Sequence, residues 1–178
     1  MSTPRDTGKA LHFLLSGVLV GMLGGIMMAL FTMLATATYL QMDFFTPLYA
    51  IAAPLVGQQP LMTSLRQGNF YLAIGPALLG LVVHLLWAGL WGLIFGLLAR
   101  RLHLTGIVAI ISGLVYGVLV MLVMIFIVVP IAGAPNLLQL LGSFLFIFAN
   151  ALFYGLPLGL WPVVQPQLFT AQPARQAV

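Results

Sequence analysis

Four apolar runs, each long enough to cross a lipid bilayer, constrain this chain more than any other feature. They cover residues 11–40, 72–99, 107–129 and 138–161, and a helix needs about 20 apolar residues to cross the hydrocarbon. Only 4% of the residues are charged, against about a quarter in a soluble domain. The sequence therefore predicts an all-α membrane protein, a single-domain bundle of four spanning helices. The first run is about twice as long as the apolar part of a signal peptide, so we expect it to remain as a span.

The few basic residues predict the orientation of the bundle. If the chain crosses the bilayer four times, Arg66 lies on one side, and the other side holds Arg5, Lys9, Arg100, Arg101 and Arg175. Basic residues gather on the cytoplasmic side. We therefore expect both termini in the cytoplasm and the protein in the bacterial inner membrane. Six scattered bases form no basic stripe, so no nucleic-acid partner is expected.

Two segments lie outside the predicted spans. Residues 41–71 form an outer loop, in which Asp43 and Arg66 are expected to be two solvated charges, since an exposed ion pair contributes little. The apolar stretch 44–56 is too short to span and contains two prolines, which favours an interfacial or re-entrant piece. Residues 163–178 are polar and contain prolines, and we expect a flexible tail.

The two halves of the chain share a pattern of glycines and aromatic residues. The spacing of Gly21 and Gly25 in the first run recurs in the third run. The segment 84–89 of the second run, with a polar residue, an aromatic residue and a glycine, resembles the segment 150–155 of the fourth. We expect two parallel helical-hairpin repeats, related by a pseudo-twofold axis along the membrane normal.

Glycines at helical spacing predict where the spans pack. Lipid provides no hydrophobic attraction between helices, so helices associate through close backbone approach at small residues. A hinge or a pore lined by backbone is the alternative interpretation, and packing is favoured because it is commoner. The glycines expected at helix contacts are Gly17, Gly21, Gly24, Gly25, Gly89, Gly92, Gly96, Gly113 and Gly117.

His84 is the most distinctive side chain of the spans, because it is the only ionisable group near the middle of one. Such groups are expensive in lipid and usually face the bundle interior. Asn150 is its counterpart in the second half, and we predict a contact between the two, a central polar pair. The supporting polar residues on the face of Asn150 are Ser143 and Tyr154. The aromatic neighbours expected beside His84 are Trp87, Trp91 and Phe95.

Three roles stay open for this polar cluster. A hydrogen bond between imidazole and amide would join two helices. Axial ligation of a haem or chlorophyll-type macrocycle by His84 is a second role, although only a five-coordinate site is possible with one buried histidine. A proton or solute gate is the third, because imidazole titrates near neutral pH. No metal site is expected, since cysteine is absent and the nine methionines suit core packing.

The acidic residues argue against an enzyme. Asp6 and Asp43 are the only acids, and neither lies near His84 in the predicted topology, so no carboxylate pair or Ser-His-Asp set can form. We expect a non-catalytic accessory or scaffold subunit of a membrane assembly, with a membrane-protein partner or a second copy of itself. The alternative is a small homo-oligomeric transporter or channel for a proton or small solute, gated at His84.

The layout resembles the YagU-type group of small bacterial inner-membrane proteins. The shared features are the glycines of the first span (Gly17, Gly21 and Gly25), the histidine followed by small and aromatic residues over 84–96, and the Pro-x-x-Gly-x-Pro element at 130–135. The resemblance implies four spans and a histidine at the position of Asn150, where this chain departs from the pattern. It implies no activity, because the role of that group is not established.

Overall fold

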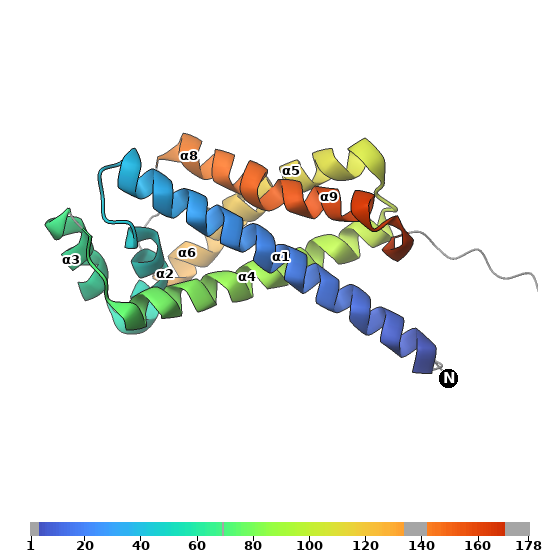
Figure 1. Ribbon diagram of the computed structural model, residues 1–178, viewed down its shortest axis with the longest axis horizontal. Helices are drawn as coiled ribbons and strands as arrows, with labels where there is room; N and C mark the ends of the chain where they lie inside the picture. Colours follow the sequence, from blue (N-terminus) through green and yellow to red (C-terminus); the bar gives the residue numbers. More distant parts are fainter. Residues whose placement is uncertain (1–3, 69, 134–141, 170–178) are drawn as a thin grey trace, which may run out of the picture.

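The structure is built from helices. The computed structural model describes residues 4–68, 70–133 and 142–169, and within these ranges it contains helices and no strand (Figure 1). The predicted all-α class is therefore confirmed. Four helical segments are long and apolar enough to cross a membrane, so the chain is a membrane protein whose outer helix faces contact lipid.

The four spanning segments follow the predicted apolar runs closely. α1 (Pro4–Thr38) and α4 (Ile74–Arg101) are single long helices. The third segment consists of α5 (Gly106–Val123), the π-helical turn η1 (Met124–Val128) and α6 (Val129–Ala132). The fourth consists of α8 (Ser143–Phe148), the π-helical turn η2 (Ala149–Gly155) and α9 (Leu156–Val164), and the short 3-10 turn η3 (Pro166–Leu168) follows it. The Pro135 position of the shared proline element lies outside the described residues.

Residues 41–71, predicted as a loop, fold into two short helices at one end of the bundle (Figure 1). These are α2 (Thr46–Val56) and α3 (Gln59–Gln67). α2 packs against α4, and the Leu48 carbonyl lies directly over Gly80, where any larger residue would collide with it. With 11 residues, α2 is too short for a fifth crossing.

Asp43 is buried in this outer segment, so the expectation of two solvated charges was wrong for it. Its carboxylate accepts hydrogen bonds from the backbone N–H groups of Phe45 (3.0 Å) and Tyr71 (2.7 Å) and from the Ser64 hydroxyl (3.2 Å). These donors replace water around the charge. The carboxylate therefore ties the beginning of the segment to its end, whereas Arg66 stays exposed.

Two helical hairpins make up the bundle. α1 packs mainly on α4, and we call α1–α4 the first hairpin; α5 packs mainly on α9 and η2, and we call residues 106–164 the second hairpin. In the first, a Cβ atom added to Gly92 would lie 2.5 Å from the Gly21 Cα and 2.6 Å from the Gly17 carbonyl oxygen. In the second, a Cβ added to Gly113 would lie 2.5 Å from the Gly159 Cα. Only glycine permits this approach.

The glycines predicted to pack all lie against a neighbouring helix or side chain. A Cβ added to any of them would find a heavy atom within 4 Å. Gly24 lies against Tyr154 and Gly96 against Trp161, so these two face aromatic rings rather than another glycine. Gly155 and Gly159 were not among the glycines predicted at helix contacts, although both meet Gly113 on the opposite helix.

The internal repeat stays a prediction, and the second hairpin differs from the first in register. In the first hairpin, the residue four positions after His84 lies against Gly21. If Asn150 and Gly113 are the counterparts of His84 and Gly21, Tyr154 should lie against Gly113, but Gly155 lies there. The turn η2 covers this position. A π-helical turn holds one residue more than an α-helical turn, which accounts for the shift by one residue.

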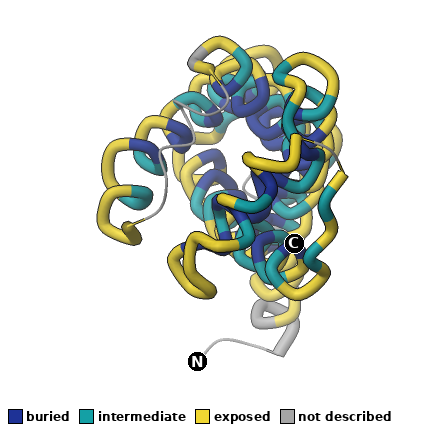
Figure 2. Tube along the Cα trace, turned by 90° about the vertical axis from the view of Figure 1, so that its left-hand side faces the viewer, coloured by how far each residue is buried: buried dark blue, intermediate teal, exposed yellow. Residues whose placement is uncertain are grey.

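Aromatic rings close the bundle at the end opposite α2 and α3. The rings of Phe13 and Trp161 stack with centroids 5.5 Å apart, and Phe169 meets Trp161 edge-on at 4.8 Å. The Arg100 guanidinium lies over Phe13 at 5.0 Å. Viewed from the α2–α3 end, the buried residues gather on the helix sides that face the inside of the bundle (Figure 2). The bundle is thus tightly packed at its basic end.

Candidate functional site

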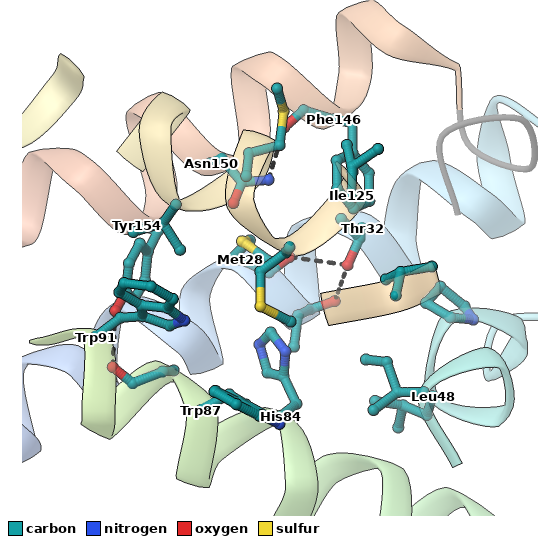
Figure 3. A pocket seen from close by; sticks show the side chains of 18 residues that line it. Met28, Thr32, Leu48, His84, Trp87, Trp91, Ile125, Phe146, Asn150 and Tyr154 are labelled. Carbon is teal, nitrogen blue, oxygen red and sulfur yellow. Dashed lines mark hydrogen bonds between the residues drawn. The ribbon is translucent and has the colours of Figure 1, made fainter. Parts of the chain in front are cut away.

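A cavity of about 110 Å³ lies between the two hairpins, on the α2 side of the bundle (Figure 3). All four spanning segments and α2 contribute to its wall, through residues such as Met28, Leu48, Trp91, Met121 and Phe146. Four further lining residues carry a polar group on an otherwise largely apolar wall: Thr32, His84, Asn150 and Tyr154. No Asp, Glu, Lys or Arg lines the cavity within the described part of the chain.

His84 projects from α4 into the cavity wall. It lies ten residues into the helix, about 15 Å from its beginning at the α-helical rise. Its Nε2 atom lies 2.9 Å from the Gly25 carbonyl oxygen of α1. Because a carbonyl oxygen only accepts, Nε2 carries the proton and donates it. Nδ1 of the neutral ring then holds a lone pair, and no described residue donates a hydrogen bond to it.

Asn150 lies in the wall opposite, in the π-helical turn η2. Its Nδ2 atom donates to the Phe146 carbonyl at 2.8 Å. The predicted contact between His84 and Asn150 was therefore wrong as a hydrogen bond, although both residues line one cavity. The physical reason is that helix carbonyls lie nearer: α4 packs so closely on α1 that the imidazole meets Gly25, and the asparagine amide turns back onto its own helix.

Tyrosine hydroxyls make the hydrogen bonds between the hairpins. Tyr154 donates to the Ala88 carbonyl at 2.7 Å, and Tyr116 donates to the Trp91 carbonyl at 2.8 Å. Tyr154 was predicted as a supporting polar residue, but on the face of Asn150 rather than as a link to α4. Tyr116 was not singled out, and its only signal in the sequence is a hydroxyl within an apolar run. The side chain of Ser143 lies outside the described residues.

The predicted aromatic neighbours separate into two groups. Trp87 and Trp91 line the cavity. Phe95 instead lies deeper in the core, with its ring 5.1 Å from that of Tyr116. The Trp91 Nε1 is the one buried side-chain nitrogen or oxygen of the described residues that has no hydrogen-bond partner. Burying such a donor carries a free-energy penalty.

The donor set limits what the site could ligate. No group of three or more His, Cys, Asp or Glu side chains converges among the described residues. His84 Nε2, one of the two imidazole atoms that could ligate a haem iron, is already bonded to Gly25. A macrocycle would have to break that bond or use Nδ1.

A second polar centre lies in the outer segment around Asp43. The Thr46 hydroxyl lies 2.6 Å from that of Ser64, which also bonds Asp43. Tyr49 donates to the Tyr71 carbonyl and accepts from the Ala73 N–H, both at 2.9 Å. Burial raises the pKa of Tyr49, and the hydrogen bond from Ala73 opposes this shift.

The two polar centres differ in what they can do. The groups around Asp43 are fully bonded to one another, so they hold the outer segment together. Those around His84 border an open space. The cavity is therefore the candidate functional site. No protein-family model, curated protein or solved structure matches this chain.

Proposed function

We propose that the chain is a non-catalytic membrane transporter that carries a small solute through the cavity between its hairpins. The observation that supports this proposal is the cavity itself, bordered by both hairpins and lined by the free acceptor atoms of His84 and Asn150. Binding sites of transporters are commonly found near the bilayer midplane, between structural halves.

The packing gives the two halves a means of relative movement. Each hairpin is held by close glycine contacts, whereas the hairpins meet each other chiefly through α1 and the fourth segment. In alternating access, rigid halves rock against each other around the site. The rings of Phe13, Trp161 and Phe169 are buried against one another at the basic end of the bundle, so a solute that leaves at this end would have to displace them.

The position of Asp43 and the uncharged lining around His84 support a non-catalytic role. Asp43 is enclosed by its three hydrogen-bond donors in the outer segment. No charged side chain among the described residues lines the cavity with His84. His84 therefore has no carboxylate beside it in the described lining to complete an acid–base pair or a triad.

A flux measurement on purified protein tests the transport role. We expect proteoliposomes to take up urea or glycerol, followed by stopped-flow light scattering, or protons, followed by an entrapped pH dye, faster than protein-free vesicles. His84→Met should lower this flux, while Leu86→Met, an apolar exchange at an exposed position of the same helix, should not. Vesicles that show no protein-dependent flux of any of these species would overturn the proposal.

An accessory subunit remains the alternative role. The exposed apolar helix faces are compatible with a partner protein or a second copy, and lipid satisfies them equally well. Native mass spectrometry of gently extracted protein distinguishes these cases. A second polypeptide that is always present would support the accessory role, and a series of self-oligomers would support a homo-oligomeric transporter. A bound macrocycle would support a cofactor at His84.

We further propose the bacterial inner membrane as the location, with both termini in the cytoplasm. The N-terminus, the α4–α5 connection and the end of α9 lie at one end of the bundle, and α2 and α3 at the other (Figure 1). Arg100 and Arg101 are exposed at the first end, which supports the cytoplasmic assignment. Reporter fusions test the orientation: a C-terminal green fluorescent protein should fluoresce, and a C-terminal alkaline phosphatase should be inactive.

A further inference from the structure

Apart from the indole N–H groups of the two tryptophans, the polar side chains that line the cavity share one hydrogen-bonding state. Thr32 Oγ1 donates to carbonyls of its own helix at 2.9 Å. His84, Asn150 and Tyr154 likewise donate to main-chain carbonyls, at 2.9, 2.8 and 2.7 Å. Each of these four donors is therefore occupied by the protein backbone.

The acceptor atoms of the same side chains remain unoccupied. No described residue donates to Nδ1 of His84 or to Oδ1 of Asn150. Within the described ranges, Trp91 Nε1 is the one side-chain polar atom that is fully buried and has no hydrogen-bond partner. The Nδ1 and Oδ1 atoms are therefore not fully buried atoms without a partner. The cavity thus presents hydrogen-bond acceptors from opposite hairpins and offers no free donor on these four residues.

The lining also excludes charged ligands. An anion would face the acceptor lone pairs of His84 and Asn150 with only indole N–H donors and no Lys or Arg beside them, and a cation would find no carboxylate on the described wall. Either charge would have to leave water without compensation, which is expensive within a membrane. A neutral group that donates a hydrogen bond fits, and the rest of the wall, built from Met, Leu, Ile, Val and aromatic side chains, suits an apolar body.

We propose that the cavity binds neutral, mostly apolar alcohols, whose hydroxyl group donates to His84 Nδ1 or Asn150 Oδ1. This inference rests on the site of the proposed transport function and names the class of ligand that the site binds. An alkyl amine, the other common donor, is protonated at neutral pH and is excluded by the absence of an acid in the described lining. The cavity volume of about 110 Å³ is several times the roughly 10–15 Å³ that one water needs on this measure, which admits a hydroxyl group with an apolar chain.

Photolabelling of the full chain in lipid nanodiscs tests the proposal. The probe is an eight-carbon alcohol that carries a diazirine, and the control probe is its methyl ether, which keeps the shape and loses the donor. We expect the alcohol to label cavity-lining peptides saturably, and the ether to need a concentration about two to ten times higher, the range for loss of one hydrogen bond. Equal labelling by both probes, or labelling outside the cavity only, would overturn the proposal.

Variants of one side chain sharpen the test. His84→Met removes the acceptor and puts an apolar side chain in its place, and we expect alcohol labelling to weaken about two- to tenfold. His84→Gln supplies an amide with both a donor for Gly25 and a free acceptor oxygen, so labelling should recover. Leu86→Met lies on the same helix as His84, at an exposed position outside the cavity lining, so it is the matched control and should leave labelling unchanged. An equal response of His84→Met and Leu86→Met would contradict the assignment.

The second acceptor keeps the proposal testable if His84→Met does not fold. Asn150→Leu removes Oδ1 and should weaken alcohol labelling while leaving labelling by the ether unchanged. Failure of this inference is separable from failure of the transport proposal. Flux of urea, glycerol or protons without alcohol-selective labelling would refute the ligand class alone, and alcohol-selective labelling without any flux would refute transport alone.

Discussion

Replacing Gly92 by alanine tests whether close glycine contact holds the first hairpin together. The added Cβ would lie 2.5 Å from the Gly21 Cα, whereas ordinary contacts of this kind measure 3.4–4 Å. α1 and α4 must therefore move apart by about 1 Å. Gaps of about 0.5–1 Å already lose a quarter to a half of the dispersion attraction between facing atoms, and overpacking typically costs about 1–3 kcal/mol.

The same displacement reaches the candidate site. His84 lies two turns from Gly92 on α4, and its hydrogen bond to Gly25 measures 2.9 Å. A separation of about 1 Å would stretch this bond beyond hydrogen-bonding distance. We therefore expect Gly92→Ala to lower the free energy of unfolding by about 1–3 kcal/mol and to change the NMR signal of the imidazole Nε2–H.

Gly75→Ala is the matched control, because Gly75 lies in the same helix and an added Cβ there meets nothing within 4 Å. Unfolding by SDS in mixed micelles, followed by tryptophan fluorescence, measures both variants. Gly75→Ala should be as stable as the parent or more stable, since alanine favours a helix. If Gly92→Ala proved as stable as Gly75→Ala, the close packing of α1 on α4 would be refuted.

Four further outcomes are expected. Tyr154→Phe should lower stability by about 0.6–1.7 kcal/mol, because it removes a hydrogen bond between the hairpins, while Tyr39→Phe at an exposed position should not; SDS unfolding compares them. Asp43→Asn should make limited proteolysis of residues 57–69 several-fold faster, because an amide nitrogen would face backbone donors, and an unchanged rate would contradict this. The outer segment should lose stability as the pH rises above about 10, since the raised pKa of Tyr49 keeps it protonated when the unfolded chain ionises; circular dichroism against pH measures this, and no loss would argue against its burial. Trp91→Phe should not destabilise the protein, because it removes a buried donor without a partner, and a lower melting temperature would indicate an acceptor for that nitrogen.

The spans could be predicted because length and apolarity alone define a membrane crossing. The helix class and the four segments follow from runs that lipid permits only as helices. The glycines at helix contacts could also be predicted, since their spacing places them on one helix face. The outer segment was not, because its order depends on backbone donors that converge on Asp43 from residues far apart in the sequence.

The site was predicted in part. His84 and Asn150 were chosen for their depth in the spans, and both line the cavity. Their partners were not predictable from side-chain types, because each uses a backbone carbonyl instead of the other residue. The extra residue in η2 has no marker in the sequence, so the register of Gly155 against Gly113 could not be foreseen.

The pairing of His84 with Gly25 also bears on biosynthesis. Both residues belong to the first hairpin, which ends at Arg101. At about 5–20 residues per second, the ribosome needs several seconds to complete the rest of the chain. During this interval the imidazole N–H already has its acceptor within the inserted hairpin. The ionisable side chain near the middle of the second span therefore has a hydrogen-bond partner in the membrane before the second hairpin is made.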